Sequence, residues 1–301
     1  MTRVEAPQAV AVIGAGLDLG ACRRGVDMGP SAIRYAGLQE RIESLGRGCV
    51  DWGDVDVSLP EATEVGDPRA RYLEPIMRSC ERVATLVEEA RRGGFVPLVL
   101  GGDHSVAMGT LGGMANAHGP GGVLWIDAHG DLNRPESSPS GNVHGMPLAA
   151  ALGAADDAFA SEAWPTPSLE RAALVGVRSL DAAERKLIGQ LGVKVFTMSD
   201  IDRYGLERAV RESLEYLDGS AFLHVSLDLD AVDPMFAPGV GTPVPGGLSY
   251  REAHLTLELV SESGRLDSLE LVEVNPILDR VNETGALAVE LAASALGARI
   301  L

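Results

Sequence analysis

Short, almost uninterrupted runs of apolar residues recur along this chain of 301 residues. Runs of this kind are typical of parallel strands that are buried on both faces of a sheet. The stretches between several of them have helical composition and periodicity. We therefore predict alternating strands and helices in a three-layer α/β/α architecture. The expected strands are 9–13, 96–100, 123–126, 173–177, 193–196, 221–227 and 268–274, with a weaker candidate at 50–57; the expected helices are 72–92, 182–191, 205–217 and 250–263, with one more beginning near residues 29–31.

The alternating pattern does not divide the chain into parts. The strongest loop signals, at 60–68, 134–147, 164–167 and 234–247, all lie between elements of the same pattern. We therefore expect a single domain over residues 1–301. Two of these loops, 134–147 and 234–247, begin just past strands that end in polar residues, which is where a scaffold carries function.

Charge and cysteine content limit the partners and the compartment. The chain has 43 acidic and 25 basic residues, a formal charge of −18. Such an excess repels nucleic acid and anionic membranes and attracts small cations, although an acidic surface alone would also explain it.

Cys22, Cys49 and Cys80 are far apart and form no CxxC pair, as expected of free thiols in a reducing compartment. Because 1–5 carries one basic residue and the apolar stretch 9–15 is too short for a signal or membrane segment, we expect a cytoplasmic protein.

Acidic and imidazole side chains directly follow four of the apolar runs. The segments are 101–104 (GGDH), 127–131 (DAHGD), 226–230 (SLDLD) and 273–276 (EVNP). Ligands of open parallel sheets bind beyond the carboxyl ends of the strands, so these segments are expected to converge. Mixed oxygen and imidazole ligation suits a manganese-like ion better than zinc, which prefers thiolates. The candidate metal ligands are His104, Asp127, His129, Asp131, Asp228 and Asp230.

The spacing within these segments favours a pair of ions. Asp127, His129 and Asp131 are two residues apart, so a brief extended path would point them the same way. Asp228 and Asp230 repeat this spacing, and two like charges on one face need a cation. For any single segment the alternative is that an aspartate caps a helix or closes a turn. Four such segments together favour a two-metal site, which suits hydrolysis because paired ions activate a water.

The remaining histidines fall into two groups. His144 follows the Asp127 segment in a loop, where it could shuttle protons near pH 7 or simply make a loop hydrogen bond. His118, His224 and His254 belong to no such segment. We expect surface or core roles for these three.

A glycine pair after the first strand invites a dinucleotide-binding interpretation. Gly14 and Gly16 have the first spacing of that motif, but the next glycine is Gly20, which misses the GxGxxG pattern. We therefore expect no dinucleotide cofactor, and a turn or a substrate-side loop in this place.

From segment 24–30 to segment 273–276, these motifs resemble the ureohydrolase family, and within it the members that hydrolyse L-arginine. The GGDH, DAHxD and SxDxD motifs are complete, and 233–234 (DP) and 241–243 (GTP) follow as in family members. The resemblance implies an α/β/α fold around an eight-stranded, mainly parallel sheet, with two Mn²⁺ ions at the strand ends. It implies that one ion is held by His104, Asp127, Asp131 and Asp228, and the other by His129, Asp127, Asp228 and Asp230.

The resemblance also implies a reaction. A hydroxide that bridges the two ions would attack the guanidinium carbon of L-arginine, giving L-ornithine and urea. The implied catalytic residues are His144 as proton shuttle, Glu273 as the carboxylate facing the guanidinium, and Asp131. The implied substrate contacts are Asn133, Ser140, Asn142, Asp181 and Thr242. The family also implies a homotrimer or a homohexamer.

Alternatives to this function stay open at the level of sequence. The same chemistry could act on agmatine or a guanidino acid, which lack part of the amino-acid head group. A non-catalytic, metal-binding scaffold is a second alternative, because a fold does not guarantee an activity. Amide deacetylation is disfavoured because Asp228, Asp230 and His129 predict a second ion. Segment 151–170 matches no motif.

Overall fold

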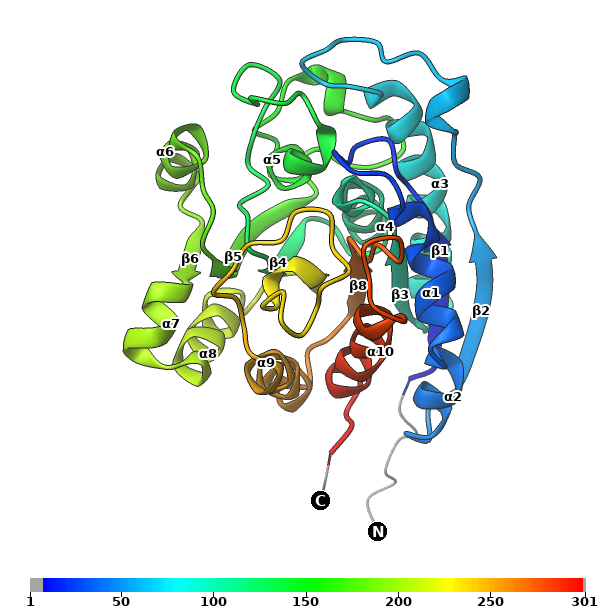
Figure 1. Ribbon diagram of the computed structural model, residues 1–301, viewed down its shortest axis with the longest axis vertical. Helices are drawn as coiled ribbons and strands as arrows, with labels where there is room; N and C mark the ends of the chain where they lie inside the picture. The colour runs from blue at the N-terminus through cyan, green and yellow to red at the C-terminus, as the bar shows by residue number, and fades with distance from the viewer. Residues whose placement is uncertain (1–7, 300–301) are drawn as a thin grey trace.

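The computed structural model describes residues 8–299 and centres on one eight-stranded sheet (Figure 1). The strand order is β2-β1-β3-β8-β7-β4-β5-β6, and every pairing between these strands is parallel. The predicted sheet of eight strands is confirmed, whereas the prediction about residues 1–5 falls outside the described residues. The strands are β1 Val10–Ala15, β2 Cys49–Asp54, β3 Val96–Gly101, β4 Gly121–Ile126, β5 Leu169–Val177, β6 Lys194–Thr197, β7 Leu223–Asp228 and β8 Ser268–Val272.

Helices cover both faces of the sheet, so the predicted three-layer architecture is also confirmed. One face carries α1 Gly29–Tyr35, α2 Leu38–Glu43, α7 Met198–Tyr204, α8 Leu206–Tyr216, α9 Tyr250–Ser263 and α10 Glu283–Ala295. The other carries α3 Leu73–Arg92, α4 Ala107–His118, α5 Pro147–Ala151 and α6 Ala182–Leu191. No helix among residues 8–299 is long and apolar enough to cross a membrane.

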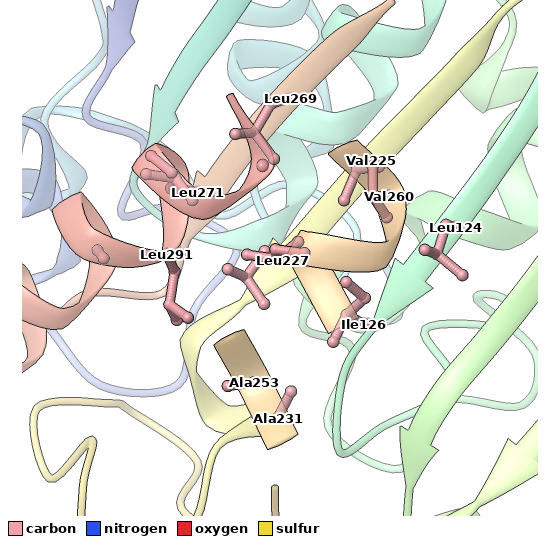
Figure 2. Close-up of a cluster of buried hydrophobic side chains, with 14 of the residues drawn as sticks. Leu124, Ile126, Val225, Leu227, Ala231, Ala253, Val260, Leu269, Leu271 and Leu291 are labelled. Carbon is pink, nitrogen blue, oxygen red and sulfur yellow. The ribbon is translucent and has the colours of Figure 1, made fainter. Parts of the chain in front are cut away.

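Alternate side chains of each strand enter the two layers. Val10 and Val12 of β1 pack on one face, and Ala11 and Ile13 pack on the other, as the period of a strand requires. Figure 2 shows the first of these layers, where leucine, isoleucine and valine side chains of β4, β7 and β8 meet α9 and α10. Both faces of the strands are buried, which is why their sequences read as continuous apolar runs.

The strand boundaries differ from the prediction by up to four residues. Strand β8 ends at Val272 instead of residue 274, because Glu273 has a φ of 65° and leaves the extended conformation. Strand β5 begins at Leu169, four residues before the predicted start, and so takes in the end of segment 151–170. Strand β2 is the weak candidate, and its side chains are largely exposed because it lies at the edge of the sheet.

The predicted helices are present, and α1 begins near residues 29–31 as expected with proline in its first turn. Five further helices were not predicted: α2, α4, α5, α7 and α10. Most residues of α4 and α10 are buried: α4 is unburied only at its last residues, and α10 exposes a narrow stripe of Glu283, Ala286 and Glu290, so the polar face that makes helical periodicity visible is small. The others are short segments of five to seven residues, below the length at which a periodic pattern is clear.

Helices α3 and α4 pack with their backbones in close contact. A Cβ atom on Gly113 would lie 2.4 Å from the carbonyl oxygen of Ala84, and one on Gly109 would lie 2.4 Å from that of Cys80. The two glycines are one turn apart, and so are the residues of α3 that they contact. Glycine is therefore required along this line of contact because no side chain fits there.

We expect Gly113→Ala to lower the free energy of unfolding by about 1–3 kcal/mol, because overpacking outweighs the better helix propensity of alanine. Gly189→Ala in α6 is the matched control, since a Cβ there meets no atom within 4 Å. That variant should gain up to about 1 kcal/mol. Urea denaturation of both variants measures the difference, and equal effects would contradict the packing argument.

Candidate metal centre

The polar segments meet where four neighbouring strands in the middle of the sheet end. Strands β3, β8, β7 and β4 are adjacent, and His104, Glu273, Asp228 and Asp127 lie at or just beyond their carboxyl ends. Their loops come together on the same edge of the sheet in Figure 1. This is the edge at which open parallel sheets bind ligands.

The first group of candidate ligands surrounds one imidazole nitrogen. His104 Nδ1 lies 3.0 Å from Asp131 Oδ2, 3.2 Å from Asp127 Oδ2 and 3.3 Å from Asp228 Oδ2. All four side chains are buried, and His104 Nδ1 has no hydrogen-bond partner. Burial and the charge of Asp127 raise the pKa of Asp131 to about 6. A buried, unpaired nitrogen facing three carboxylate oxygens is the arrangement expected of a cation site.

The second group shares Asp127 with the first. His129 Nδ1 lies 3.0 Å from Asp230 Oδ2 and 3.5 Å from Asp127 Oδ1. Burial opposes a proton on His129, but the two carboxylates outweigh it and raise the pKa of this imidazole to about 12. Metal ions would replace such protons, because metals bind the neutral imidazole and the charged carboxylate.

The donor set fits hard divalent ions. Four buried aspartates and two imidazoles are collected within two groups that share one residue, and the close carboxylates need a cation to offset their repulsion. No cysteine belongs to either group, and the three cysteines of the described chain are free thiols elsewhere. Oxygen and imidazole donors of this kind suit manganese-like ions.

Turns, not extended strands, bring the ligands together. Asp127 Oδ1 accepts a hydrogen bond from His129 N at 2.7 Å, and Asp228 Oδ1 accepts one from Asp230 N at 2.7 Å. Asp131 has a φ of 50°, so the chain does not continue as the brief extended path proposed from the spacing. That explanation of the spacing was wrong, although the side chains do converge.

A tryptophan and an arginine hold the surrounding loops. Trp125 Nε1 donates to Asp127 Oδ2 at 3.0 Å, and the Trp125 ring stacks on His104 with the ring centres 4.1 Å apart. Arg178 donates to the carbonyl oxygens of residues 176, 230, 231 and 244 at 2.7–3.3 Å. It thereby ties the end of β5 to the loop that carries Asp230 and Thr242. Thr242 Oγ1 in turn donates to Asp230 Oδ2 at 2.9 Å.

His144 and Glu273 form a pair beside the metal groups. His144 Nδ1 lies 2.9 Å from Glu273 Oε1, which also accepts from the backbone N of His104 at 3.0 Å. Glu273 Oε2 is buried and has no partner. Burial opposes the proton on His144, but the charge of Glu273 outweighs it and raises the pKa of the imidazole to about 9. The pair therefore offers one proton-carrying ring and one free carboxylate oxygen.

A cavity of about 200 Å³ opens beside these groups. Asn133 and Asp181 line it, and Asn133 Nδ2 donates to Asp181 Oδ2 at 2.8 Å. Ser140 and Asn142 do not line it: the Ser140 hydroxyl accepts from the backbone of Asn142 at 3.2 Å and shapes the loop that leads to His144. The cavity wall consists of His104, His129, Asp131, Asn133, His144, Gly145, Ser179, Asp181, Glu184, Asp228 and Thr242.

Glu184 and Ser179 are cavity residues that the sequence analysis missed. Glu184 is buried, and burial raises its pKa to about 7. Asp181 and Glu184 form a capping box at the start of α6, in which each side chain accepts from the backbone of the other. The spacing of an acid three residues after a helix-capping aspartate was a usable signal for this box.

The other histidines have core or surface roles, as expected. His224 is fully buried and pairs with Ser268, and His254 is nearly buried and pairs with Ser294. His118 is at the end of α4 and accepts a hydrogen bond from Arg91.

Gly20 packs tightly at the site, since a Cβ there would lie 2.8 Å from Asp103 Oδ1. The loop after β1 therefore closes against the metal centre.

Both the sequence and the structure of this chain are similar to those of known proteins. The sequence pattern of the Arginase family matches residues 8–297. The arginase of Bacillus caldovelox is 48% identical over 296 residues, covering 97% of this chain and 99% of that protein, and its structure superposes with a TM-score of 0.94 over 98% of this chain and 100% of that one. The structure of arginase from Bacillus subtilis is 48% identical with a TM-score of 0.91, over 98% of this chain and 100% of that one. The arginase of Staphylococcus aureus (strain MSSA476) is 41% identical over 98% of this chain and 99% of that protein.

We expect Asp228→Ala to lose bound metal, because it removes a carboxylate oxygen that lies 3.3 Å from His104 Nδ1 in the first group. The affinity for Mn²⁺ should fall by about 100-fold or more. Metal content after loading and gel filtration measures this. His144→Ala is the control and should keep wild-type metal content, since His144 belongs to neither group. Loss of metal from the His144 variant would mean that His144 is itself a ligand.

Proposed function

Because the chain belongs to the arginase family, we propose that it hydrolyses L-arginine to L-ornithine and urea with two Mn²⁺ ions. The chain is a hydrolase of that family. The observation that carries the proposal is the pair of imidazole–carboxylate groups that share Asp127 beside a cavity lined by acids. A cationic substrate and two divalent ions match this concentration of negative charge.

The ligands that we propose are the members of the two groups, with Asp228 of the first group shared by both ions. His104, Asp127, Asp131 and Asp228 would hold one ion, and His129, Asp127, Asp228 and Asp230 the other. When bound, two such ions lower the pKa of a water and polarise the substrate, which makes hydrolysis possible at neutral pH. Manganese is favoured over zinc because the donors are oxygen and imidazole.

Glu273 and His144 supply the groups that the substrate needs. Glu273 Oε2 is a buried acceptor without a donor, which suits the planar guanidinium with its forked N–H groups. His144 Nδ1 is engaged by Glu273, so its Nε2 is the atom that exchanges protons with the bound substrate. Asp131 is the third catalytic residue that we propose, because its carboxylate lines the cavity and its Oδ2 lies 3.0 Å from His104 Nδ1.

Other residues of the cavity wall are suited to an amino-acid head group. Asp181 and Glu184 offer carboxylates to an α-ammonium, and Asn133 offers an amide to an α-carboxylate. We propose that Ser140 and Asn142 contact the carboxylate from the neighbouring loop, and that Thr242 contacts the substrate from the side of Asp230. A site with polar groups placed for this head group discriminates against substrates that lack it.

We further propose a cytoplasmic homotrimer or homohexamer built from single-domain subunits. The basis is the ureohydrolase resemblance together with the composition of the chain, which suits a reducing compartment. Sedimentation analysis of the Mn²⁺-loaded protein distinguishes the two assemblies from a monomer. No nucleic acid or membrane partner is proposed, because the net charge of −18 would repel both.

We expect the purified protein, stripped of metal and reloaded with Mn²⁺, to release urea from L-arginine and far less from agmatine or guanidinobutyrate. The stripped protein should be inactive because the water is then not activated. Urea release against the three compounds in parallel is the measurement. Turnover of agmatine or guanidinobutyrate alone would keep the metal chemistry and refute the proposed substrate, and no turnover of any compound would favour a metal-binding scaffold.

We expect Asp181→Ala to lower kcat/KM for L-arginine by about 10- to 100-fold, the effect of losing one charged hydrogen bond. Its Mn²⁺ content should stay at the wild-type value. Asp181 also caps α6, so Ser249→Ala, which removes the capping box of α9, is the matched control for stability. Both variants should lose about 1 kcal/mol of unfolding free energy. Equal loss of activity in both would show that Asp181 has only a structural role.

A further inference from the structure

A column of polar side chains runs through the core beneath the metal centre. His224, Ser226 and Asp228 occupy alternate positions of β7, and their apolar neighbours in the strand pack in the layer of α9 and α10. The three polar side chains therefore point toward the layer of α3 and α4. On the adjacent strand β8, Ser268 and Glu270 are the register partners of His224 and Ser226. The pattern HVSLD beside SLEL is the sequence signature of this column.

The column connects to the candidate ligand His104 by short contacts. His104 Nε2 lies 2.7 Å from Ser226 Oγ, and Ser226 Oγ donates to Glu270 Oε1 at 2.6 Å. Glu270 Oε1 lies 3.3 Å from His224 Nε2, and His224 Nδ1 lies 2.8 Å from Ser268 Oγ. All five side chains are at most 1% exposed. None of Glu270, His224 and Ser268 lines the substrate cavity.

The chemistry of these contacts sets the direction of each hydrogen bond. An ionised carboxylate only accepts, so the Ser226 hydroxyl proton points to Glu270. The Ser226 oxygen is then free to accept from His104 Nε2–H. With its proton on Nε2, the neutral His104 ring presents a lone pair at Nδ1, the atom that faces Asp127, Asp131 and Asp228. This is the tautomer that binds a metal ion at Nδ1.

Stability alone does not account for Glu270. Its Oε2 atom is buried without a partner, and His224 Nε2 also lacks a well-aligned hydrogen bond. Burying a carboxylate in this way is costly, and an apolar residue of similar volume would serve the core as well or better. The charge is useful only if it acts on something, and the candidate ligand His104, whose Nε2 lies 3.9 Å from Glu270 Oε1, is within its reach.

We propose that Glu270 is a positioning residue which, through Ser226, fixes the His104 tautomer that binds metal, while His224 holds Glu270 in place. The proposal rests on the two-metal site proposed above. Glu270 has no contact with the substrate cavity, so its role is in metal affinity and not in substrate binding. The carboxylate, hydroxyl and imidazole form the outer support of one of the two ions only.

The test uses Glu270→Leu and Glu270→Gln in the full chain. Leu removes the acceptor entirely, and Gln keeps the size while removing the charge, which covers the case that the Leu variant does not fold. Mn²⁺ titration of the stripped proteins against a competing chelator should show one of the two ions bound about 10- to 100-fold more weakly, with a smaller effect in Gln than in Leu. At saturating Mn²⁺ the KM for L-arginine should equal the wild-type value.

Ser294→Ala is the matched control. It removes a hydroxyl that is 2.9 Å from His254 Nδ1, a buried serine–histidine pair of the same kind in the helical layer of α9 and α10. This variant should bind two Mn²⁺ ions with wild-type affinity. Melting of the metal-free proteins separates a general loss of stability from a specific loss of metal affinity.

Two results would overturn the proposal. Wild-type affinity for both ions in both Glu270 variants would show that the tautomer of His104 does not depend on the column. Equal weakening of both ions, together with a lower melting temperature of the metal-free protein, would show a structural role. The test of the Glu270 variants and the test of the proposed reaction can fail independently. A wild-type protein that binds two ions but releases no urea would refute the proposed reaction and leave the role of Glu270 in metal affinity untouched.

Discussion

Mutual repulsion among buried carboxylates is the constraint on which the rest of this structure depends. Asp127, Asp131, Asp228 and Asp230 are all at most 6% exposed, and Glu273 lies beside them. In an interior of low dielectric such charges cannot stay close unless cations or protons offset them. The imidazoles, the loop carbonyls tied by Arg178 and the stacked tryptophan all serve to hold these acids together. Bringing these carboxylates together lowers the stability of the metal-free protein at this edge of the sheet, and the same carboxylates are what attract cations to it.

In two of these aspartates the two carboxylate oxygens have different surroundings. In Asp127 and Asp228, Oδ1 closes the local turn and Oδ2 faces His104. The capping interpretation is therefore confirmed, and it does not compete with the proposed ligand role, because the two use different oxygens of the same carboxylate. Because the turn fixes the orientation of the carboxylate, no additional residue is needed to aim the second oxygen.

The sequence was sufficient to predict the three layers, the eight-stranded sheet and the groups of polar residues at the edge of that sheet. Continuous apolar runs report burial on both faces, and acids directly after them report strand ends. The path between those acids could not be predicted, because the left-handed conformations of Asp131 and Glu273 depend on tertiary contacts. Helices α4 and α10 were missed for a related reason, since burial of most of their surface leaves only a small polar face. Glu270 was not predicted as a site residue, because a single acid within an apolar strand forms no pattern of spaced polar residues.

Trp125 gives the metal centre an optical property of its own. The indole is fully buried, stacks on His104 and donates to Asp127, so a change of charge at these two side chains alters the electric field on the ring. The other two tryptophans are elsewhere: Trp52 packs on Phe95, and Trp164 packs on Gly112 of α4. The intrinsic fluorescence of the protein therefore contains one component that reads the state of the site without any label.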